Sequence, residues 1–416
     1  MSERRSCRSE MQACLGALAP GCPSSKVAEL TSLVDETMHG SARFYHNLPH
    51  ALMVAESADP LDVLIGLFHD IVQVGVDQGI PPVVEPLLAG MIHSPAPLAY
   101  ALVDSPQTRD DRIFEMVRGS FGYAHGQTLA PFGGQNEFLS ALAAAKALAS
   151  VVDESAVLAM TLGIEATVPF RQDADAVGRS ALSTLATLNQ RLSLGLSPET
   201  LRTQVKRAVR IANRDVRSFG ENDLIALLDD TWALMYESSL ELQRAEGANF
   251  GRYRQALQRM TRFLGSLSAP VIFRRFDDEP DAASFEALAH RTSRNLAVIG
   301  AIMQRKLLAA SLLEAAADSS TATFRPQRHA LAGAQGGARI DPVMQAVLAA
   351  GREPPIEFDI RQSPLAHEIA MSMSSADVEQ SLYEVDPSGP VRASLLATVP
   401  EPVATKARAL ADHMMA

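Results

Sequence analysis

Cysteine and aromatic residues are scarce in this sequence of 416 residues. It contains three cysteines, one tryptophan and 5% aromatic residues. The spacing of the cysteines, Cys7, Cys14 and Cys22, matches no CxxC zinc pattern, and their odd number argues against a disulfide framework. Unpaired thiols are typical of a reducing compartment, so we expect a cytoplasmic protein.

The sequence also lacks an apolar run long enough to cross a bilayer, which takes about 20 residues. Its longest apolar stretches, such as residues 141–145 and 158–162, are much shorter. The first 22 residues open with a basic stretch, but Glu10 and Gln12 interrupt any apolar segment that could serve as a signal peptide. We therefore expect neither a membrane span nor a signal sequence.

Basic residues are too few for a protein that binds nucleic acid. There are 37 lysines and arginines against 48 aspartates and glutamates, which gives a net charge of −11. A chain of this charge repels a phosphate backbone, so dedicated nucleic-acid binding is not expected. A small phosphorylated molecule remains a possible partner, because one local group of arginines or a metal can bind it. Hydrophobic residues make up 47% of the chain, which excludes global disorder.

Strand-like alternation of β-branched residues is nearly missing, whereas apolar residues at helical spacing recur along the chain. Asp59-Pro60 and Ser197-Pro198 have the residue types of an N-cap followed by a first helical residue. The pattern predicts an all-α fold with helices over residues 27–38, 44–57, 60–74, 136–150, 154–166, 174–193, 198–213, 221–245, 250–267 and 281–317.

Two stretches interrupt the helical pattern and suggest the domain organisation. Residues 119–135 are glycine-rich and predict a long loop, and residues 318–342 have the composition of a linker. We therefore expect five parts, of which the C-terminal helices could mediate homo-oligomer or protein contacts. They are an N-terminal segment at 1–24, the main helical domain at 25–245, a helical extension at 246–317, a linker or mobile loop at 318–342 and a helical tail at 343–416.

Histidines cluster before residue 70. Four of the ten lie there, at His39, His46, His50 and His69. His46 and His50 are four residues apart, which places two side chains on one face of a helix. Asp70 follows His69 in a strongly apolar segment, where an unpaired carboxylate is costly unless it meets a cation. Imidazole nitrogen and carboxylate oxygen together suit Mg²⁺, Mn²⁺ or Fe²⁺, whereas a hydrogen-bonded pair inside a helical core is the structural alternative.

The stretch RFYHNLPH, which ends at His50, and the following GLFHDIV resemble the HD superfamily of metal-dependent phosphohydrolases. The likeness is to the bacterial branch with an R-x-Y-H-N-x-x-H opening, and it covers residues 43–72. In that family a first histidine, a His-Asp doublet and a distant aspartate bind one or two divalent metals in an all-helical bundle. The resemblance implies that His50 is the first histidine and His69-Asp70 the doublet, with His46 beside them. The main domain is then an HD-like bundle.

Two segments compete to supply the distant aspartate. Residues 209–220 contain Asp215 near the end of a predicted helix and are similar to the closing stretch of the family. Residues 163–171 end an apolar helix with Glu165 but contain no aspartate. We predict that Asp215 is the fourth metal ligand. Glu165 is then a further carboxylate at the site, either a ligand to a second metal or a general base.

Arginines near these carboxylates have two readings. Arg171, Arg214 and Arg217 could hold a phosphate group through bidentate contacts. Each could equally form an ion pair inside the protein, Arg171 with Glu165 and either of the others with Asp215. The sequence leaves both possibilities open.

The sequence departs from the family pattern after the doublet. The family has an acidic pair there, and this chain has only Asp77. His93 and His125 are the candidates for the histidines that mark two-metal members, but the sequence around them is weakly patterned.

The resemblance implies metal-dependent hydrolysis of a phosphate ester in a nucleotide-like metabolite. Asp70 would bridge the ions or orient the attacking water. A non-catalytic regulatory or ligand-sensing protein on a degenerate HD fold is the first alternative, favoured by the missing acidic pair. A di-iron HD oxygenase is the second, and it needs more histidine and carboxylate ligands than we can place in the sequence.

Overall fold

The computed structural model shows a predominantly helical protein, which confirms the all-α prediction at the level of fold class. The one sheet in the described part of the chain is an antiparallel hairpin of β1 (Ile92–Ala96) and β2 (Ala99–Leu102). The structure describes residues 6–171, 174–222, 224–243, 250–318, 363–385 and 391–415.

The chain forms two compact units. The first comprises Met1–Arg217 and Ala269–Ala289, and the second comprises Ser218–Ser268 and His290–Ala416. We expected the main domain to run without interruption to residue 245, but the first unit leaves the chain at Arg217 and resumes only at Ala269. The reason is that the helix formed after this point packs against its own successors, which belong to the second unit.

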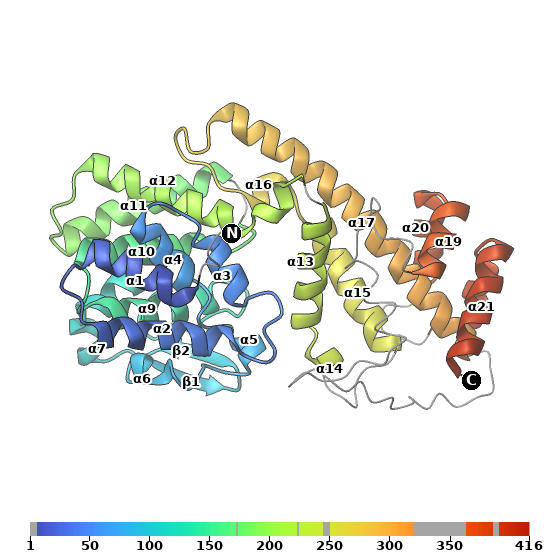
Figure 1. Cartoon of the computed structure of the whole chain (residues 1–416), viewed down its shortest axis with the longest axis horizontal. Helices are drawn as coiled ribbons and strands as arrows, with labels where there is room; N and C mark the ends of the chain where they lie inside the picture. Colours follow the sequence, from blue (N-terminus) through green and yellow to red (C-terminus); the bar gives the residue numbers. More distant parts are fainter. Residues whose placement is uncertain are drawn as a thin grey trace. The chain divides into compact units, whose positions relative to one another are not determined.

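The first unit is built around α10, which packs against α4, α9 and α12 (Figure 1). Every residue of α4 after Pro60 is buried, and so are nine of the thirteen residues of α10, which explains why both segments are rich in apolar residues. The helices of this unit are α1 (Cys7–Leu18), α2 (Ser24–Met38), α3 (Leu48–Val54), α4 (Pro60–Phe68), α5 (Val74–Asp77), α6 (Glu85–Leu88), α7 (Pro106–Asp110), α8 (Arg112–Ser120), α9 (Gln135–Leu148), α10 (Glu154–Ala166), α11 (Ala174–Arg191), α12 (Pro198–Asp215) and α16 (Ala269–Ile272).

The segment expected at 1–24 contains α1, which the sequence analysis did not predict. α1 packs against α2 and α4, and it buries Cys7 and Cys14. All three cysteines are free thiols. Burial raises the pKa of both buried thiols to about 12, so they are inert apolar side chains at neutral pH.

Two predicted helices are shorter than expected, and their ends shape the site. The helix predicted over 44–57 is α3, and the one predicted over 60–74 stops as α4 at Phe68. α4 ends there because Arg43 binds the next carbonyl groups: Nη1 donates to Asp70 O at 2.6 Å and Nη2 to Ile71 O at 3.3 Å. The chain therefore turns away directly after α4, at the His-Asp doublet.

The second unit has its own apolar core, formed by the C-terminal part of α17 (Ala282–Asp318) together with α19 and α21. Buried members of this core include Leu312, Ile369 and Val403. The linker expected at 318–342 lies, after Asp318, outside the described residues. The remaining elements of this unit are η1 (Arg217–Gly220), α13 (Leu224–Glu237), α14 (Leu240–Gln243), α15 (Phe250–Gly265), α19 (Pro364–Ser372), α20 (Ser375–Tyr383), η3 (Ala393–Ala397) and α21 (Glu401–Met415).

One helix in the described part of the chain, Ala282–Ala317, is long and apolar enough to cross a membrane by length and composition alone. The sequence predicts a helix over residues 281–317, but we did not expect it to be apolar enough to span a bilayer. In the structure, 61% of its most apolar stretch is buried, as in a core helix of a globular protein.

Candidate metal centre

Four residues predicted to bind a metal come together in the first unit. His50 lies on α3, His69 and Asp70 follow α4, and Asp215 is the last residue of α12. One nitrogen or oxygen atom of each side chain lies within 4.8 Å of the others. Residues separated by up to 165 positions in sequence therefore form one cluster, which we call the ligand group.

The atoms of the ligand group lie at distances typical of side chains facing a common point. His69 Nε2 is 2.9 Å from Asp70 Oδ2 and 3.5 Å from Asp215 Oδ1. His50 Nε2 is 3.0 Å from Asp215 Oδ1 and 3.6 Å from Asp70 Oδ2. His50, His69 and Asp70 are buried and Asp215 is half-buried, so little water reaches these groups.

The hydrogen bond of His69 shows which nitrogen is free. Its Nδ1 lies 2.8 Å from the carbonyl oxygen of Gly66, which can only accept. Nδ1 therefore donates, and in the neutral ring Nε2 keeps its lone pair. Nε2 is buried and forms no hydrogen bond, although Asp70 Oδ2 is close. A lone pair turned toward two carboxylate oxygens fits a divalent cation, and a backbone partner on the other nitrogen is typical of metal-binding histidines.

The electrostatics of the ligand group also favour a cation. Burial alone would raise the pKa of Asp70, but the imidazoles of His69, His46 and His50 outweigh it and lower the pKa. Burial alone would lower the pKa of His69, but Asp70 and Asp215 outweigh it and raise the pKa well above its usual value. In the described residues no arginine or lysine is bonded to the side chain of either aspartate. The two carboxylates therefore favour a positive charge beside them, which can be a proton on a histidine or a bound metal ion.

A close helix contact holds the two histidines together. α3 packs against α4, and a Cβ atom on Gly66 would lie only 2.4 Å from the backbone nitrogen of Ala55. No other residue type fits there without moving the backbone. Gly66 thus allows the end of α3 to approach α4, and this approach brings the His50 and His69 rings to 5.3 Å between centroids.

Ion pairs fix α12 and so place Asp215. Arg207 Nε donates to the buried Asp62 Oδ1 at 2.9 Å, and Nη2 of the same side chain is bonded to Asp59. Arg214 Nη1 donates to Val54 O at 2.8 Å, and its Nη2 lies 3.5 Å from Asp62 Oδ2. Arg214, for which the sequence left open either phosphate binding or an ion pair with Asp215, therefore binds Val54 and Asp62.

Asp77, the single acidic residue soon after the doublet, has a structural partner. Arg43 Nε and Nη2 donate to its two oxygens at 2.8 and 2.6 Å. The same arginine binds the backbone of the doublet, so this ion pair supports the turn. Asp77 does not join the ligand group.

Glu165 lies outside the ligand group as well. Arg171 Nη1 donates to Glu165 Oε1 at 2.6 Å and Nη2 to the Glu165 carbonyl at 2.5 Å. This is the ion pair that the sequence left open as the alternative to a catalytic role. Arg217 lies 3.0 Å from Glu56, and His46 lies beside the site with its ring 6.0 Å from the His50 ring.

Three residues at the site had no signal in the sequence analysis: Gln73, Asn136 and Glu137. Gln73 Nε2 donates to Asp70 Oδ1 at 2.8 Å, and Asn136 Nδ2 donates to Gln73 Oε1 at 2.8 Å. Burial, with Asp70 and Asp215 nearby, raises the pKa of Glu137 to about 7. Only the position of Gln73, three residues after Asp70, could have indicated any of them.

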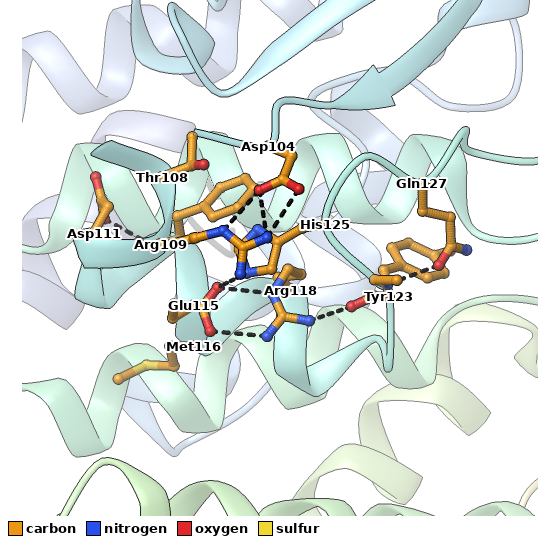
Figure 2. A network of polar contacts seen from close by, with 12 residues as sticks. Asp104, Thr108, Arg109, Asp111, Glu115, Met116, Arg118, Tyr123, His125 and Gln127 are labelled. Atoms are coloured by element: carbon orange, nitrogen blue, oxygen red, sulfur yellow. Dashed lines mark hydrogen bonds and ion pairs between the residues drawn. The ribbon is translucent and has the colours of Figure 1, made fainter. Parts of the chain in front are cut away.

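The two further histidines considered for a second metal lie elsewhere. His93 is exposed on β1. His125 belongs to a polar network beside α8, in which its Nε2 lies 2.9 Å from Glu115 Oε1 (Figure 2). Arg118 binds both oxygens of Glu115 at 2.8 Å and also the carbonyl of Tyr123. The network ties the glycine-rich loop at 119–135 to α8 and contributes no ligand to the centre.

Comparison with known proteins adds no assignment. No protein-family model matches the chain, and neither a curated protein nor a solved structure matches it.

Proposed function

We propose that this protein is a metal-dependent phosphohydrolase of the HD type that acts on a small phosphate ester such as a nucleotide-like metabolite. One observation carries the proposal: two imidazoles and two carboxylates converge in a largely buried place, and within the described residues no arginine or lysine is bonded to these carboxylates. The local sequence that resembles the HD superfamily supplies three of these four residues. The three free thiols of the protein are consistent with a cytoplasmic location.

His50, His69, Asp70 and Asp215 would hold the cation, with Mg²⁺, Mn²⁺ and Fe²⁺ as the candidates for this mixed set of nitrogen and oxygen donors. A bound divalent cation lowers the pKa of water and polarises a phosphoryl oxygen. The carboxylates of Asp70 and Asp215 provide the negative charge that retains the cation.

The arginines are not needed for the proposal. Arg171, Arg214 and Arg217 each have a partner within the protein, which are Glu165, Val54 O with Asp62, and Glu56. A phosphate group would therefore be bound chiefly at the metal centre.

A non-catalytic sensor is the second candidate, and one observation favours it. Where the family has an acidic pair after the doublet, this chain has Gln73 bound to Asp70 and Asp77 bound to Arg43. Such a centre could retain a metal without supporting turnover. A di-iron oxygenase has less support, because the described residues contain one group of four ligands and an oxygenase of that kind needs more.

The proposal is tested by assaying the purified chain with Mn²⁺ against a panel of nucleoside mono- and diphosphates. Wild type should release phosphate, and Asp70→Ala should lose both bound metal and activity while keeping its helical content. Asp110→Ala, an exposed aspartate at the end of α7, is the matched control and should behave as wild type. A wild type that binds Mn²⁺ yet hydrolyses no member of the panel would favour the sensor, and one that binds no divalent metal would refute both.

A further inference from the structure

The two oxygens of the Asp70 carboxylate have different neighbours. Oδ2 faces the imidazoles, at 2.9 Å from His69 Nε2 and 3.6 Å from His50 Nε2. Oδ1 accepts a hydrogen bond from Gln73 Nε2 at 2.8 Å. Asp70 is only 5% exposed, so protein groups and not bulk water decide which oxygen is available.

Gln73 is itself held by a second amide. Asn136, in the first turn of α9, donates from Nδ2 to Gln73 Oε1 at 2.8 Å. The other end of the Asn136 amide accepts from the backbone N–H of Val74 at 3.0 Å. One turn further along α9, Ser140 Oγ accepts from Val72 N at 3.0 Å. Asn136 and Ser140 of α9 thus each accept a hydrogen bond from the backbone of the turn after the doublet.

The chemistry of the two ends fixes the orientation of both amides. The backbone N–H of Val74 can only donate, so Asn136 must present its oxygen there and its NH₂ group to Gln73. Gln73 must then present its oxygen to Asn136 and its NH₂ group to Asp70, whose ionised carboxylate can only accept. Rotating either amide by half a turn would bring two donors or two acceptors face to face. The chain of bonds therefore has one possible direction.

We infer that Gln73 and Asn136 form a positioning relay. By donating to Oδ1 of Asp70, Gln73 holds the carboxylate so that Oδ2 points into the ligand group, and Asn136 holds Gln73. This inference rests on the proposed metal centre. Because Oδ1 accepts from Gln73, Oδ2 is the Asp70 oxygen that would be offered to a cation. Asn136 acts on the centre only through Gln73.

The test is Mn²⁺ titration by calorimetry of the full chain, prepared free of metal, together with its thermal unfolding. Gln73→Met keeps nearly the same volume but removes both amide bonds, and it should weaken Mn²⁺ binding about 10- to 100-fold, the usual effect of losing such a supporting bond. Gln135→Met is the matched control. Gln135, the first residue of α9, is buried as Gln73 is, but its amide donates to Leu98 O at 3.3 Å and not to Asp70. Its replacement should therefore leave Mn²⁺ affinity unchanged.

A second variant keeps the inference testable if Gln73→Met folds poorly. Asn136→Asp retains an acceptor for Val74 N but cannot donate to Gln73, so it should weaken Mn²⁺ binding by less than Gln73→Met. The double variant should bind Mn²⁺ no more weakly than Gln73→Met alone, because residues acting in series are not additive.

The outcomes separate this inference from the proposed function. Mn²⁺ affinities that are equal in wild type and both single variants would overturn the relay and leave the metal centre intact. A loss in the double variant equal to the product of the single losses would also overturn it. A wild type that binds no Mn²⁺, Mg²⁺ or Fe²⁺ would overturn the proposed function, and the relay with it.

Discussion

Two groups of carboxylates, Asp62 and the pair formed by Asp70 and Asp215, meet residues of α12 or its C-terminal end, and they differ in their partners. Asp62 meets two guanidinium groups of α12, from Arg207 at 2.9 Å and Arg214 at 3.5 Å, together with Ser57 Oγ at 3.1 Å. At the C-terminal end of α12, the side chains of Asp215 and Asp70 meet imidazoles and one amide, and no arginine or lysine among the described residues. The first group is neutralised by the protein and the second is not.

The comparison shows how a buried carboxylate can be assigned to structure or to a candidate site. A carboxylate with an arginine at hydrogen-bond distance already has its counter-charge, so its loss would leave the arginine uncompensated and destabilise the fold. Two carboxylates with only titratable partners need a proton or a cation from elsewhere. The four predictions below test this difference, from the largest expected effect to the smallest.

The largest effect should come from Asp62→Asn. This change leaves Arg207 and Arg214 partly uncompensated in a buried place, and the free energy of unfolding should fall by about 3 kcal/mol. The estimate lies at the low end of the usual range because Asp59 still pairs with Arg207. Urea denaturation followed by circular dichroism measures it. A change below about 0.5 kcal/mol, as on an ordinary surface, would contradict the structural role of Asp62.

Asp215→Asn should affect metal binding far more than stability. Metal affinity should fall at least about 100-fold, since a charged ligand is replaced by a neutral amide. The metal-free protein should lose less stability than it does with Asp62→Asn, because the change removes the contacts of Asp215 with His50 and His69 but also one of two neighbouring negative charges. Mn²⁺ calorimetry and urea denaturation in EDTA check the two halves. Strong destabilisation with unchanged affinity would show that Asp215 is structural, as Asp62 is.

The stability of the metal-free protein should fall as the pH rises. The pKa of His69 is raised on folding, so its contribution is complete below the unfolded value of about 6.5 and disappears as the pH rises through the folded value. The pKa of Glu137 is also raised on folding, to about 7, so the loss of its proton likewise lowers stability as the pH rises. With Mn²⁺ the trend should weaken or reverse, because metal binding requires an unprotonated His69.

This pH effect is measured as the melting temperature between pH 6 and pH 9, with EDTA and with Mn²⁺. His69→Gln should flatten the curve recorded in EDTA. A melting temperature of the metal-free wild type that climbs across this range would show that the ligand group does not stabilise the fold through a proton.

The smallest effect should come from Glu165→Gln. Its carboxylate is bound to Arg171, and the pair is partly exposed, so the free energy of unfolding should fall by about 1 kcal/mol or less. Phosphatase activity and Mn²⁺ affinity should stay close to wild type. Loss of turnover with unchanged metal affinity would instead return Glu165 to the catalytic role that the sequence allowed.

The local sequence carried most of the information about the elements. Helical spacing identified the segments that became α4, α10 and α12, and the Asp59-Pro60 and Ser197-Pro198 caps marked two of their starts. The end of α4 could not be predicted in this way. It depends on Arg43, which lies 27 positions before Asp70 and binds the carbonyl that a longer helix would have used.

The division into units shows the same limit. Residues 221–245 have helical periodicity, and a periodic helix can pack on either side of a boundary. Whether α13 belongs with the first or the second unit depends on which apolar faces it meets, and it packs against α14 and α15. Periodicity in one segment carries no information about its partner.

For the site, the sequence by itself determined the residue types and three of the four positions, because His50, His69 and Asp70 lie in one short stretch with a recognisable pattern. It also proposed Asp215, but with Glu165 as a rival. Only the tertiary structure brought Asp215 to the cluster and paired Glu165 with Arg171. Gln73 and Asn136 came from the tertiary structure alone, since an uncharged amide has no signature until its hydrogen-bond partners are in place. Helix formation depends on neighbours along the chain, whereas the partner of a buried charge is set by packing between segments far apart in sequence.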